Sequence, residues 1–290
     1  IMELNISTQN NLNLVPKRNE ESKGTLLGVL DGCVTSIGSR KLKKIIKNPF
    51  LDINKIKERQ FYVDYFFNDV LLRENVREKL KDIYDIERIA GKIIYGTENG
   101  KDLLSLKDSI RKSLETYKLL KEHQELKKIF ELDIEILLDI YNKIELIIDV
   151  EAPFSVREGG IIKDGYNSEL DELRRISKLG KDFILEIEQR ERERTGIKGL
   201  KIKYNKVFGY FIEVTKANEH LVPEDYIRKQ TLVNSERYIV PDLKEYEEKV
   251  ITAKSKIEAL EYELFKSLSS EIKEHIESLY KLANRIANLD

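Results

Sequence analysis

Residues 201 to 216 read KIKYNKVFGYFIEVTK, and their apolar side chains recur at every second position. Alternation of this kind is typical of β-strands with one buried face. Residues 204 to 207, Tyr-Asn-Lys-Val, can reverse the chain, so we expect two strands joined by a turn there. Most of the flanking sequence has apolar residues three and four apart, which is the period of an α-helix. The sequence therefore predicts a small β-sheet inserted in a helical protein.

The composition indicates an elongated protein without a membrane span. Of the 290 residues 36% are charged and 41% hydrophobic, which is enough apolar material for a core but more charge than a compact globule needs. The net charge of −1 gives no overall attraction to nucleic acid or membrane, so such a partner needs a local patch. The single cysteine, Cys33, and a start without a signal peptide predict a cytoplasmic protein with no membrane partner.

Several helices are expected before the sheet. A helical pattern begins near Lys23 and is stopped by Asn48-Pro49. Further helices are predicted at about 70 to 82, 84 to 95, 99 to 122 and 132 to 148, and together they form a bundle.

Two predictions concern the beginning of the chain. Residues 1 to 15 alternate weakly, which favours a strand followed by an entry loop. Asp52 is a good N-cap for a helix. The expected apolar face of that helix consists of Ile53, Ile56, Val63 and Phe67.

Two long helical stretches flank the sheet. The first runs from about Ser168 to Arg194, and the second begins near Pro241. The second has apolar residues at alternating spacings of three and four, the seam of a two-helix coiled coil: Leu243, Tyr246, Val250, Ala253, Ile257, Leu260 and Leu264. We expect the two stretches to pair antiparallel as an arm of roughly 37 Å for 25 helical residues, with the sheet at its tip.

The predicted tip is the basic end of the protein. Between Gly196 and Arg237 eight basic and five acidic residues give a net charge of +3, which leaves about −4 for the rest. Alternation places Lys201 and Lys203 opposite the apolar face of their strand. In the next strand the predicted core residues are Phe208, Tyr210, Ile212 and Val214. A basic sheet face suits phosphate binding, although many such faces are simply solvated.

Catalytic motifs are absent from the sequence. The histidines, His123, His220 and His275, lie far apart and give no metal-ligand spacing. The glycine-rich stretch at 159 to 165 reads as a loop, and neither a P-loop nor a nucleophile elbow occurs. We therefore expect no catalytic residue, no metal and no cofactor in this chain.

Long segments resemble one family. TGIKGLKIKYNKVFGYFIEVTK, from residue 195, and YIRKQTLVNSERYIVPDLKEYEEKVITAKSKIEALEYELF, from residue 226, resemble the clamp and returning lever helix of the MutS family of bacterial DNA mismatch repair proteins. GTLLGVLDGCVTSIGSRKLKKIIKNPFLDINKIKERQ, from residue 24, resembles its core helices. IIKDGYNSELDELRRIS, from residue 161, resembles its rising lever.

The resemblance implies a mainly α fold, in which an elongated helical bundle bears a long antiparallel two-helix lever with a small β-rich clamp at its tip. Residues 1–22 would be an entry segment from a preceding domain, and 23–195 the core helices and ascending lever. Residues 196–240 would be the clamp, and 241–290 the descending lever helix.

The resemblance also implies a function. The clamp would contact the backbone of double-stranded DNA without sequence preference, and the lever would couple that contact to a distant ATPase. The sequence contains neither the family's N-terminal mismatch-reading domain with its Phe-x-Glu motif nor its C-terminal nucleotide-binding domain with its Walker motifs. We therefore expect this fragment not to be an enzyme, with ATP and Mg bound elsewhere in the whole protein. The expected partners are DNA, bound weakly by the fragment, and a second MutS subunit. The alternative is a coiled-coil scaffold whose tip binds a protein.

Eight residues follow as candidate contacts to the DNA backbone. At the strand turn the resemblance points to Lys203, Asn205 and Lys206. In the second segment it points to Arg228, Lys229, Thr231, Asn234 and Arg237. Gly209, between two aromatic residues, is expected to serve packing or twist instead.

Overall fold

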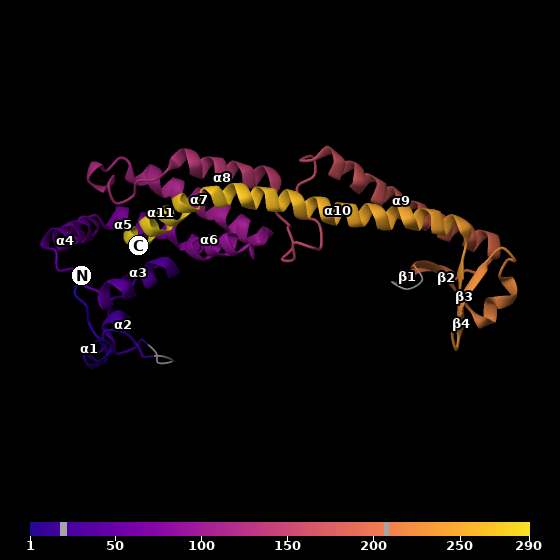
Figure 1. Ribbon diagram of the computed structural model, residues 1–290, viewed down its shortest axis with the longest axis horizontal. Helices are drawn as coiled ribbons and strands as arrows, with labels where there is room; N and C mark the ends of the chain where they lie inside the picture. The colour runs from indigo at the N-terminus through magenta and orange to yellow at the C-terminus, as the bar shows by residue number, and fades with distance from the viewer. Residues whose placement is uncertain (18–21, 206–208) are drawn as a thin grey trace. The chain divides into compact units, whose positions relative to one another are not determined.

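A computed structural model describes residues 1–17, 22–205 and 209–290. The described chain is mainly helical and contains one four-stranded antiparallel sheet (Figure 1). This confirms the predicted mainly α class with a small β element. The chain forms two compact units, of which the first comprises Ile1–Val156 with Phe265–Asp290 and the second Arg157–Leu264.

The first unit is a helical bundle. Its helices are α1 (Ile6–Asn11), α2 (Leu26–Leu30), α3 (Ser36–Lys47), α4 (Ile53–Asn68), α5 (Val70–Lys81), α6 (Ile86–Tyr95), α7 (Gly100–Leu120), α8 (Ile134–Ile147) and α11 (Ile276–Leu289), with a 3-10 turn at Gln124–Leu126. The four bundle helices predicted between 70 and 148 are thereby confirmed to within a few residues.

Local signals explain where these helices begin. Asn99 and Asp102 form a reciprocal capping box at the start of α7, which supplies acceptors for backbone amides that have no partner inside the helix. Helix α7 then presents Leu103, Leu106 and Ile110, each fully buried, at spacings of three and four. Helix α7 packs on α5 and α8, and α11 packs on α3 and α6. The core of this unit lies between these helices.

Two predictions for the beginning of the chain were wrong. Residues 1 to 15 form no strand, and instead α1 starts at Ile6 because the Asn5 side chain accepts the Thr8 amide at 2.8 Å. Asp52 caps α4 as predicted, through the Asn54 amide at 2.9 Å. The predicted apolar face of α4 is not buried, however, with Ile53 65%, Ile56 36%, Val63 64% and Phe67 72% exposed.

A different face of α4 is turned inward, and its side chains are amphipathic. The Tyr65 hydroxyl hydrogen-bonds Nδ1 of His123 at 2.9 Å, and the Arg59 guanidinium lies 4.5 Å from the Phe50 ring. Aromatic rings with a polar end can satisfy such contacts while covering carbon surface. The spacing of aliphatic residues alone therefore identified the wrong face.

The second unit contains one long helix, a second long helix as far as Leu264, and the sheet. Helix α9 (Ser168–Thr195) leads into β1 (Lys201–Asn205) and β2 (Gly209–Thr215). A 3-10 helix (Lys216–Leu221), β3 (Ile227–Thr231) and β4 (Ser235–Ile239) follow, and α10 (Pro241–Glu274) begins directly afterwards. The strand order is β1-β2-β4-β3, with every neighbouring pair antiparallel.

The first two residues of the predicted turn belong to a strand instead. Tyr204 is still in β1, where it pairs with Tyr210, and Asn205 pairs with Gly209. Lys206 and Val207, the rest of the predicted turn, lie outside the described residues. The predicted hairpin itself is confirmed, because β1 and β2 are antiparallel neighbours.

Helices α9 and α10 pair antiparallel, as predicted. Arg174 contacts Glu261 at 2.7 Å, and Arg190, roughly 24 Å farther along α9 at about 1.5 Å per residue, contacts Asp242 at 2.9 Å. Residue numbers therefore rise along α9 as they fall along α10. Between these contacts Gly180 faces Val250 so closely that a Cβ at position 180 would lie 2.2 Å from Val250 Cγ2.

The predicted seam of α10 faces this partner. Leu243, Val250 and Ala253 are buried. Farther along, Ile257, Leu260 and Leu264 are half-buried. The side chain of Tyr246, the remaining seam residue, lies outside the described part of the chain. Burial of this stripe accounts for the pairing of two otherwise charged helices.

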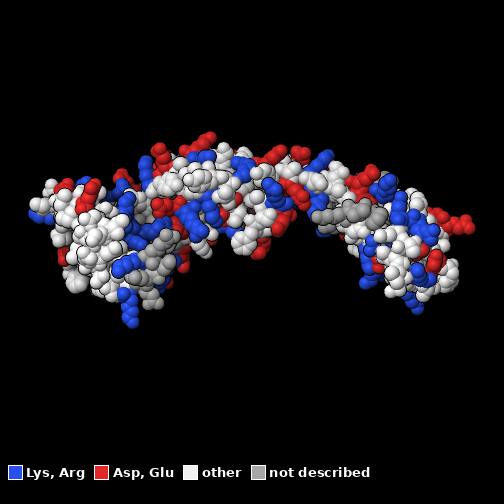
Figure 2. Space-filling model, turned by 60° about the horizontal axis from the view of Figure 1, so that its bottom comes forward, with Lys and Arg blue, Asp and Glu red and all other residues white. Residues whose placement is uncertain are grey.

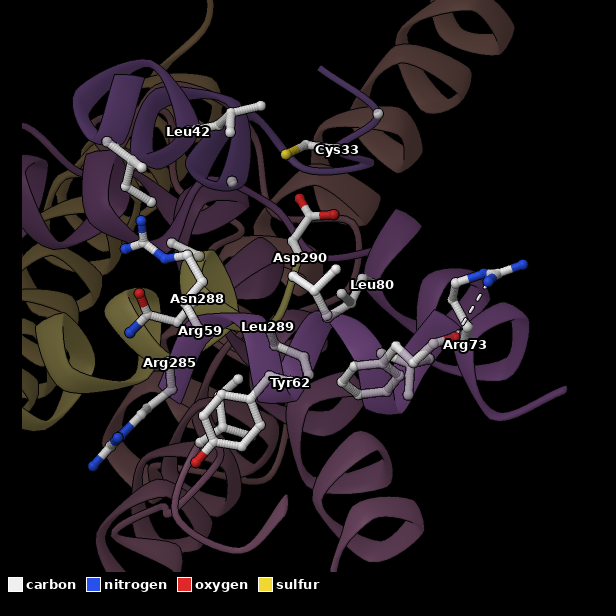
Figure 3. A pocket seen from close by; sticks show the side chains of 18 of the residues that line it. Cys33, Leu42, Arg59, Tyr62, Arg73, Leu80, Arg285, Asn288, Leu289 and Asp290 are labelled. Atoms are coloured by element: carbon white, nitrogen blue, oxygen red, sulfur yellow. Dashed lines mark hydrogen bonds between the residues drawn. The ribbon is translucent and has the colours of Figure 1, made fainter. Parts of the chain in front are cut away.

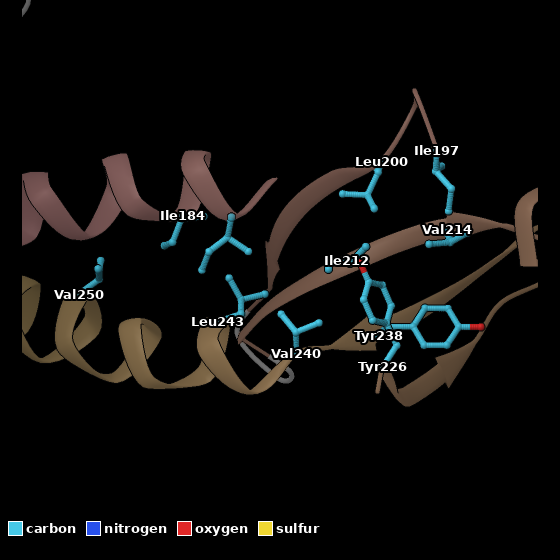
Figure 4. Close-up of a cluster of buried hydrophobic side chains, with 11 residues drawn as sticks. Ile184, Ile197, Leu200, Ile212, Val214, Tyr226, Tyr238, Val240, Leu243 and Val250 are labelled. Atoms are coloured by element: carbon cyan, nitrogen blue, oxygen red, sulfur yellow. The ribbon is translucent and has the colours of Figure 1, made fainter. Parts of the chain in front are cut away.

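One hydrophobic cluster joins the helix pair to the sheet (Figure 4). Its members come from α9, α10, the strands and the segments that connect them: Ile184, Ile187, Ile197, Leu200, Ile212, Val214, Tyr226, Tyr238, Val240, Leu243 and Val250. Tyr210 packs against it, so the predicted common face of Tyr210, Ile212 and Val214 is confirmed. Phe208 lies outside the described residues. The sheet therefore has one face turned to this cluster and one turned away, here named the outer face.

Candidate functional site

The outer face of the sheet is a row of polar side chains. Directly paired residues of antiparallel strands project on the same side. Lys201 pairs with Glu213, Glu213 with Arg237, and Arg237 with Gln230. Lys203 belongs to the same face. It pairs with Phe211, and Phe211 lies two residues before Glu213 in β2, so the two side chains project on the same side. Strand pairing thus gathers three cations around one carboxylate.

Glu213 holds two of these cations. Lys203 Nζ lies 2.8 Å from Glu213 Oε1, and Arg237 Nε lies 3.5 Å from Oε2. Arg237 also donates to Gln230 Oε1 at 2.7 Å, and its guanidinium covers the Phe211 ring at 4.5 Å. Phe211 is only 2% exposed, although it points away from the hydrophobic cluster. Arg237 therefore both carries charge and shields an aromatic ring.

The titration of Glu213 should report this arrangement. The Lys203 hydrogen bond, helped by Arg237, lowers the pKa of the Glu213 carboxyl below its usual range. The ionised Glu213 carboxylate therefore stabilises the folded state. Its full contribution is present above the unfolded pKa of about 4.3 and is lost as the pH falls through the lower folded pKa. In Lys203→Met we expect the Glu213 midpoint, followed by NMR, to rise. Stability should then change less with pH in this acidic window, and an unmoved midpoint would contradict the contact.

Two candidate residues are engaged by a different carboxylate. Arg228 Nη1 lies 3.3 Å from Glu236 Oε1, and the Thr231 hydroxyl donates to the same oxygen at 3.2 Å. Glu236 is 4% exposed and also accepts the Tyr238 hydroxyl at 2.6 Å, which lowers its pKa. Burial and the neighbouring Glu236 raise the pKa of Tyr238 to about 12. These contacts tie edge strand β3 to β4.

The remaining candidates lie at the bulge of β3 or near the ends of strands. Lys229 is exposed at the bulge between Arg228 and Gln230 and forms no ion pair with any residue described in the structure. Asn234 is exposed in the β3–β4 turn, where its carbonyl accepts the Lys216 amide at 3.2 Å. Asn205 ends β1, and Lys206 lies outside the described residues.

The structure therefore divides the candidates into small groups. Lys203 and Arg237 come together at Glu213, and Arg228 and Thr231 come together at Glu236. The candidate set omitted Lys216 and Lys201. Lys201 shares the face of Lys203, which alternation in the sequence already indicates, whereas Lys216 reaches Asn234 only through the pairing of β2 with β4. Acidic side chains lie among the cations on the visible surface (Figure 2).

A cavity in the first unit offers no obvious chemistry. It has a volume of about 730 Å³ and is lined by side chains of α3, α4 and α5 and by the end of α11 (Figure 3). Cys33 lies at its edge, where burial and the charges of Asp290 and Asp31 raise the pKa of the thiol to about 12. The thiolate needed for nucleophilic attack is therefore disfavoured at neutral pH.

The described residues contain neither a cluster of metal ligands nor a helix suited to cross a membrane. Within 1–17, 22–205 and 209–290, no three His, Cys, Asp or Glu side chains gather as metal ligands would. Across the same described ranges, no helix is both long and apolar enough to cross a membrane.

Comparison with known proteins gives a consistent result. Residues 7–290 match the family model described as MutS domain III. The chain is 91% identical over 290 residues to "DNA mismatch repair protein MutS" of Fusobacterium nucleatum subsp. nucleatum, covering 100% of the chain and 32% of that protein. The protein of the same name from Halothermothrix orenii is 47% identical over 291 residues, which cover 100% of the chain and 32% of that protein. The protein of that name from Carboxydothermus hydrogenoformans is 44% identical over 301 residues, which cover 98% of the chain and 34% of that protein.

The chain spans about a third of the length of these curated relatives. The predicted resemblance is confirmed over almost the whole chain, because the family model begins at residue 7 and runs to residue 290. The chain belongs to the MutS domain III family.

Proposed function

We propose that this chain is the part of a DNA mismatch repair protein that grips duplex DNA by its phosphate backbone. The outer face of the sheet carries the proposal: Lys201, Lys203 and Arg237 surround the single carboxylate of Glu213. Relatives up to 91% identical bear the name of a DNA mismatch repair protein. The eight sequence candidates, with Lys201 and Lys216 added, are the proposed contacts.

The chemistry of these side chains favours the backbone over the bases. Lysine and arginine bind phosphate oxygens, and short polar side chains such as Thr231 and Asn234 add hydrogen bonds to phosphate or sugar. Such contacts fix position without reading sequence, and they release counterions, so binding weakens with salt. DNA would compete with Glu213 for Lys203 and Arg237, since both cations already contact that carboxylate.

The proposed role of α9 and α10 is to couple this contact to ATP hydrolysis elsewhere in the whole protein. Their shared hydrophobic cluster with the sheet supports the proposal, because a movement of the helices must be accommodated by the strands. ATP and Mg would bind in the two thirds of the relatives that this chain does not span, and the working protein would include a second MutS subunit in the cytoplasm. This chain alone is proposed to lack enzymatic activity and to bind DNA weakly.

Salt dependence of DNA binding tests the proposal. In the natural full-length protein, Lys203→Gln with Lys229→Gln should weaken binding to a short duplex. The slope of log K against log salt should fall by about 0.9 for each phosphate that is no longer neutralised, which amounts to roughly tenfold in affinity per phosphate at about 0.1 M salt. Titrations between roughly 50 and 200 mM salt measure both quantities, because such effects are large over that range.

Lys178→Gln with Lys256→Gln is the matched control. Both lysines are exposed on the helix pair, and the charge change is the same. The control should leave the slope and the affinity unchanged. If the Lys203 and Lys229 pair also leaves them unchanged, the proposal fails, and a photoreactive group at position 234 that labels protein instead of DNA would favour a scaffold role.

A further inference from the structure

We propose that two carboxylates, Glu188 of α9 and Glu247 of α10, are positioning residues that hold the β1–β2 hairpin to both helices at once. Each accepts a backbone amide from one strand of the hairpin. The consequence for DNA rests on the proposed function, because Lys203 is presented by this hairpin. The anchoring itself can be measured without DNA.

The first anchor protects the edge of the sheet. Strand β1 is an edge strand, so its outward backbone groups have no strand partner. Glu188 Oε2 accepts the Ile202 amide at 2.7 Å, and Arg192 Nε donates to the Leu200 carbonyl at 2.6 Å. Arg192 also contacts Glu188 on the same helix. Side chains of α9 thus replace the missing strand.

The second anchor fills a space that a glycine leaves open. The Glu247 carboxylate accepts the amide of Tyr210 at the start of β2. Gly209 is buried with φ at +74°, and a Cβ there would lie 1.6 Å from Glu247 Oε1. Burial raises the pKa of Glu247, and the Tyr210 amide offsets part of that rise. Partial burial of a carboxylate is unfavourable unless a hydrogen bond compensates for it, and the Tyr210 amide supplies that bond.

The two anchors hold opposite strands of one hairpin. Ile202 pairs with Ile212 across the hairpin, and Tyr204 pairs with Tyr210. Because α9 holds β1 while α10 holds β2, a shift of one helix along the other must tilt the hairpin or break an anchor. The direction of Lys203, which follows Ile202, is fixed by the same contacts. The helix pair therefore sets how this cation is presented.

The test uses a substitution whose electrostatic and positional effects have opposite signs. Removing an acid beside a phosphate-binding surface should by itself tighten DNA binding. In the natural full-length protein, Glu247→Ala should instead weaken duplex binding by up to roughly tenfold at about 0.1 M salt, which is the effect expected of one phosphate contact. Glu247→Gln keeps an acceptor oxygen and should bind at least as well as the unchanged protein.

Glu248→Ala is the matched control, because it removes the same charge from the next, exposed residue of α10. It should bind DNA no more weakly than the unchanged protein. Equal effects of Glu247→Ala and Glu248→Ala on affinity would overturn the positioning role. A weakening by Glu247→Gln as large as that by Glu247→Ala would overturn it too, since charge would then be the cause.

Hydrogen exchange without DNA separates the anchor from the proposed function. In Glu247→Ala the Tyr210 amide should exchange about tenfold faster or more, and in Glu188→Ala the Ile202 amide should do the same. Unchanged exchange overturns the anchors directly. Suppose that exchange becomes faster while DNA affinity stays unchanged. If Lys203→Gln with Lys229→Gln weakens DNA binding, this result overturns the positioning role. If that double substitution has no effect on binding either, the result counts against the proposed function.

Discussion

Arg174→Ala is expected to lower the free energy of unfolding of the second unit by about 3–5 kcal/mol, the usual effect of removing one partner of a buried ion pair. The Glu261 side chain is only 1% exposed, and its Oε1 lies 2.7 Å from Arg174 Nη2. Without the guanidinium the carboxylate would stay buried with its charge unmatched. Urea unfolding followed by hydrogen exchange in α9 measures the change.

The same arginine ties a loop to both helices. Arg174 Nη2 also donates to the Ile162 carbonyl at 2.8 Å, and Arg174 contacts Asp164. Glu261 Oε2 accepts the Ile161 amide at 2.8 Å. Faster exchange of the Ile161 amide should therefore accompany the drop in stability. This local effect distinguishes the broken network from general weakening of the helix.

Arg175→Ala provides the control at the next position. Arg175 is exposed and contacts Glu172 one turn earlier on the same helix. Exposed pairs of this kind contribute little, because water screens them and the side chains lose freedom. Arg175→Ala should leave both the unfolding curve and the Ile161 amide unchanged. Equal effects of the two substitutions would mean that the Glu261 contact carries no stability.

The helices were predictable because their signals are local. Asp52 and Asn99 cap α4 and α7 through amides within three residues, and the seam of α10 repeats over three heptads of one stretch. The strand predicted in residues 1 to 15 was wrong because another local signal was stronger. The Asn5 side chain caps a helix, and this outweighed a weak alternation of apolar residues. Where one short-range signal dominates, the sequence predicts the element; where two compete, it does not.

The site was predictable only in part, because it depends on strand register. Alternation identified the exposed face of Lys203, yet Glu213 lies between Lys203 and Arg237 only through the order β1-β2-β4-β3. Likewise Glu188 and Arg192 are two of many charged residues on α9, yet they bind the backbone at Leu200 and Ile202. A charged residue in a sequence does not show which amide or carboxylate the fold brings to it.

Gly209→Ala is the second substitution with a large expected effect, a loss of about 2.5–5 kcal/mol in the free energy of unfolding of the second unit. Alanine at a φ of +74° costs roughly 1–2 kcal/mol of backbone strain. The new Cβ would also meet Glu247 Oε1 at 1.6 Å and displace the carboxylate, which removes a charged hydrogen bond to Tyr210 of about 1.5–3 kcal/mol. Urea unfolding of both proteins gives the difference.

Gly196→Ala separates the two contributions. Gly196 has nearly the same φ, +73°, and nothing lies within 4 Å of a Cβ built there. It should show the backbone strain alone, about 1–2 kcal/mol. In a Glu247→Ala background the Gly209→Ala cost should fall to that same value, because the displaced carboxylate is already gone. Two results would contradict this explanation: a loss of stability in Gly209→Ala no larger than in Gly196→Ala, or losses in Gly209→Ala and Glu247→Ala that add fully in the double variant. Either would mean that Gly209 is needed only for its backbone conformation and not to make room for Glu247.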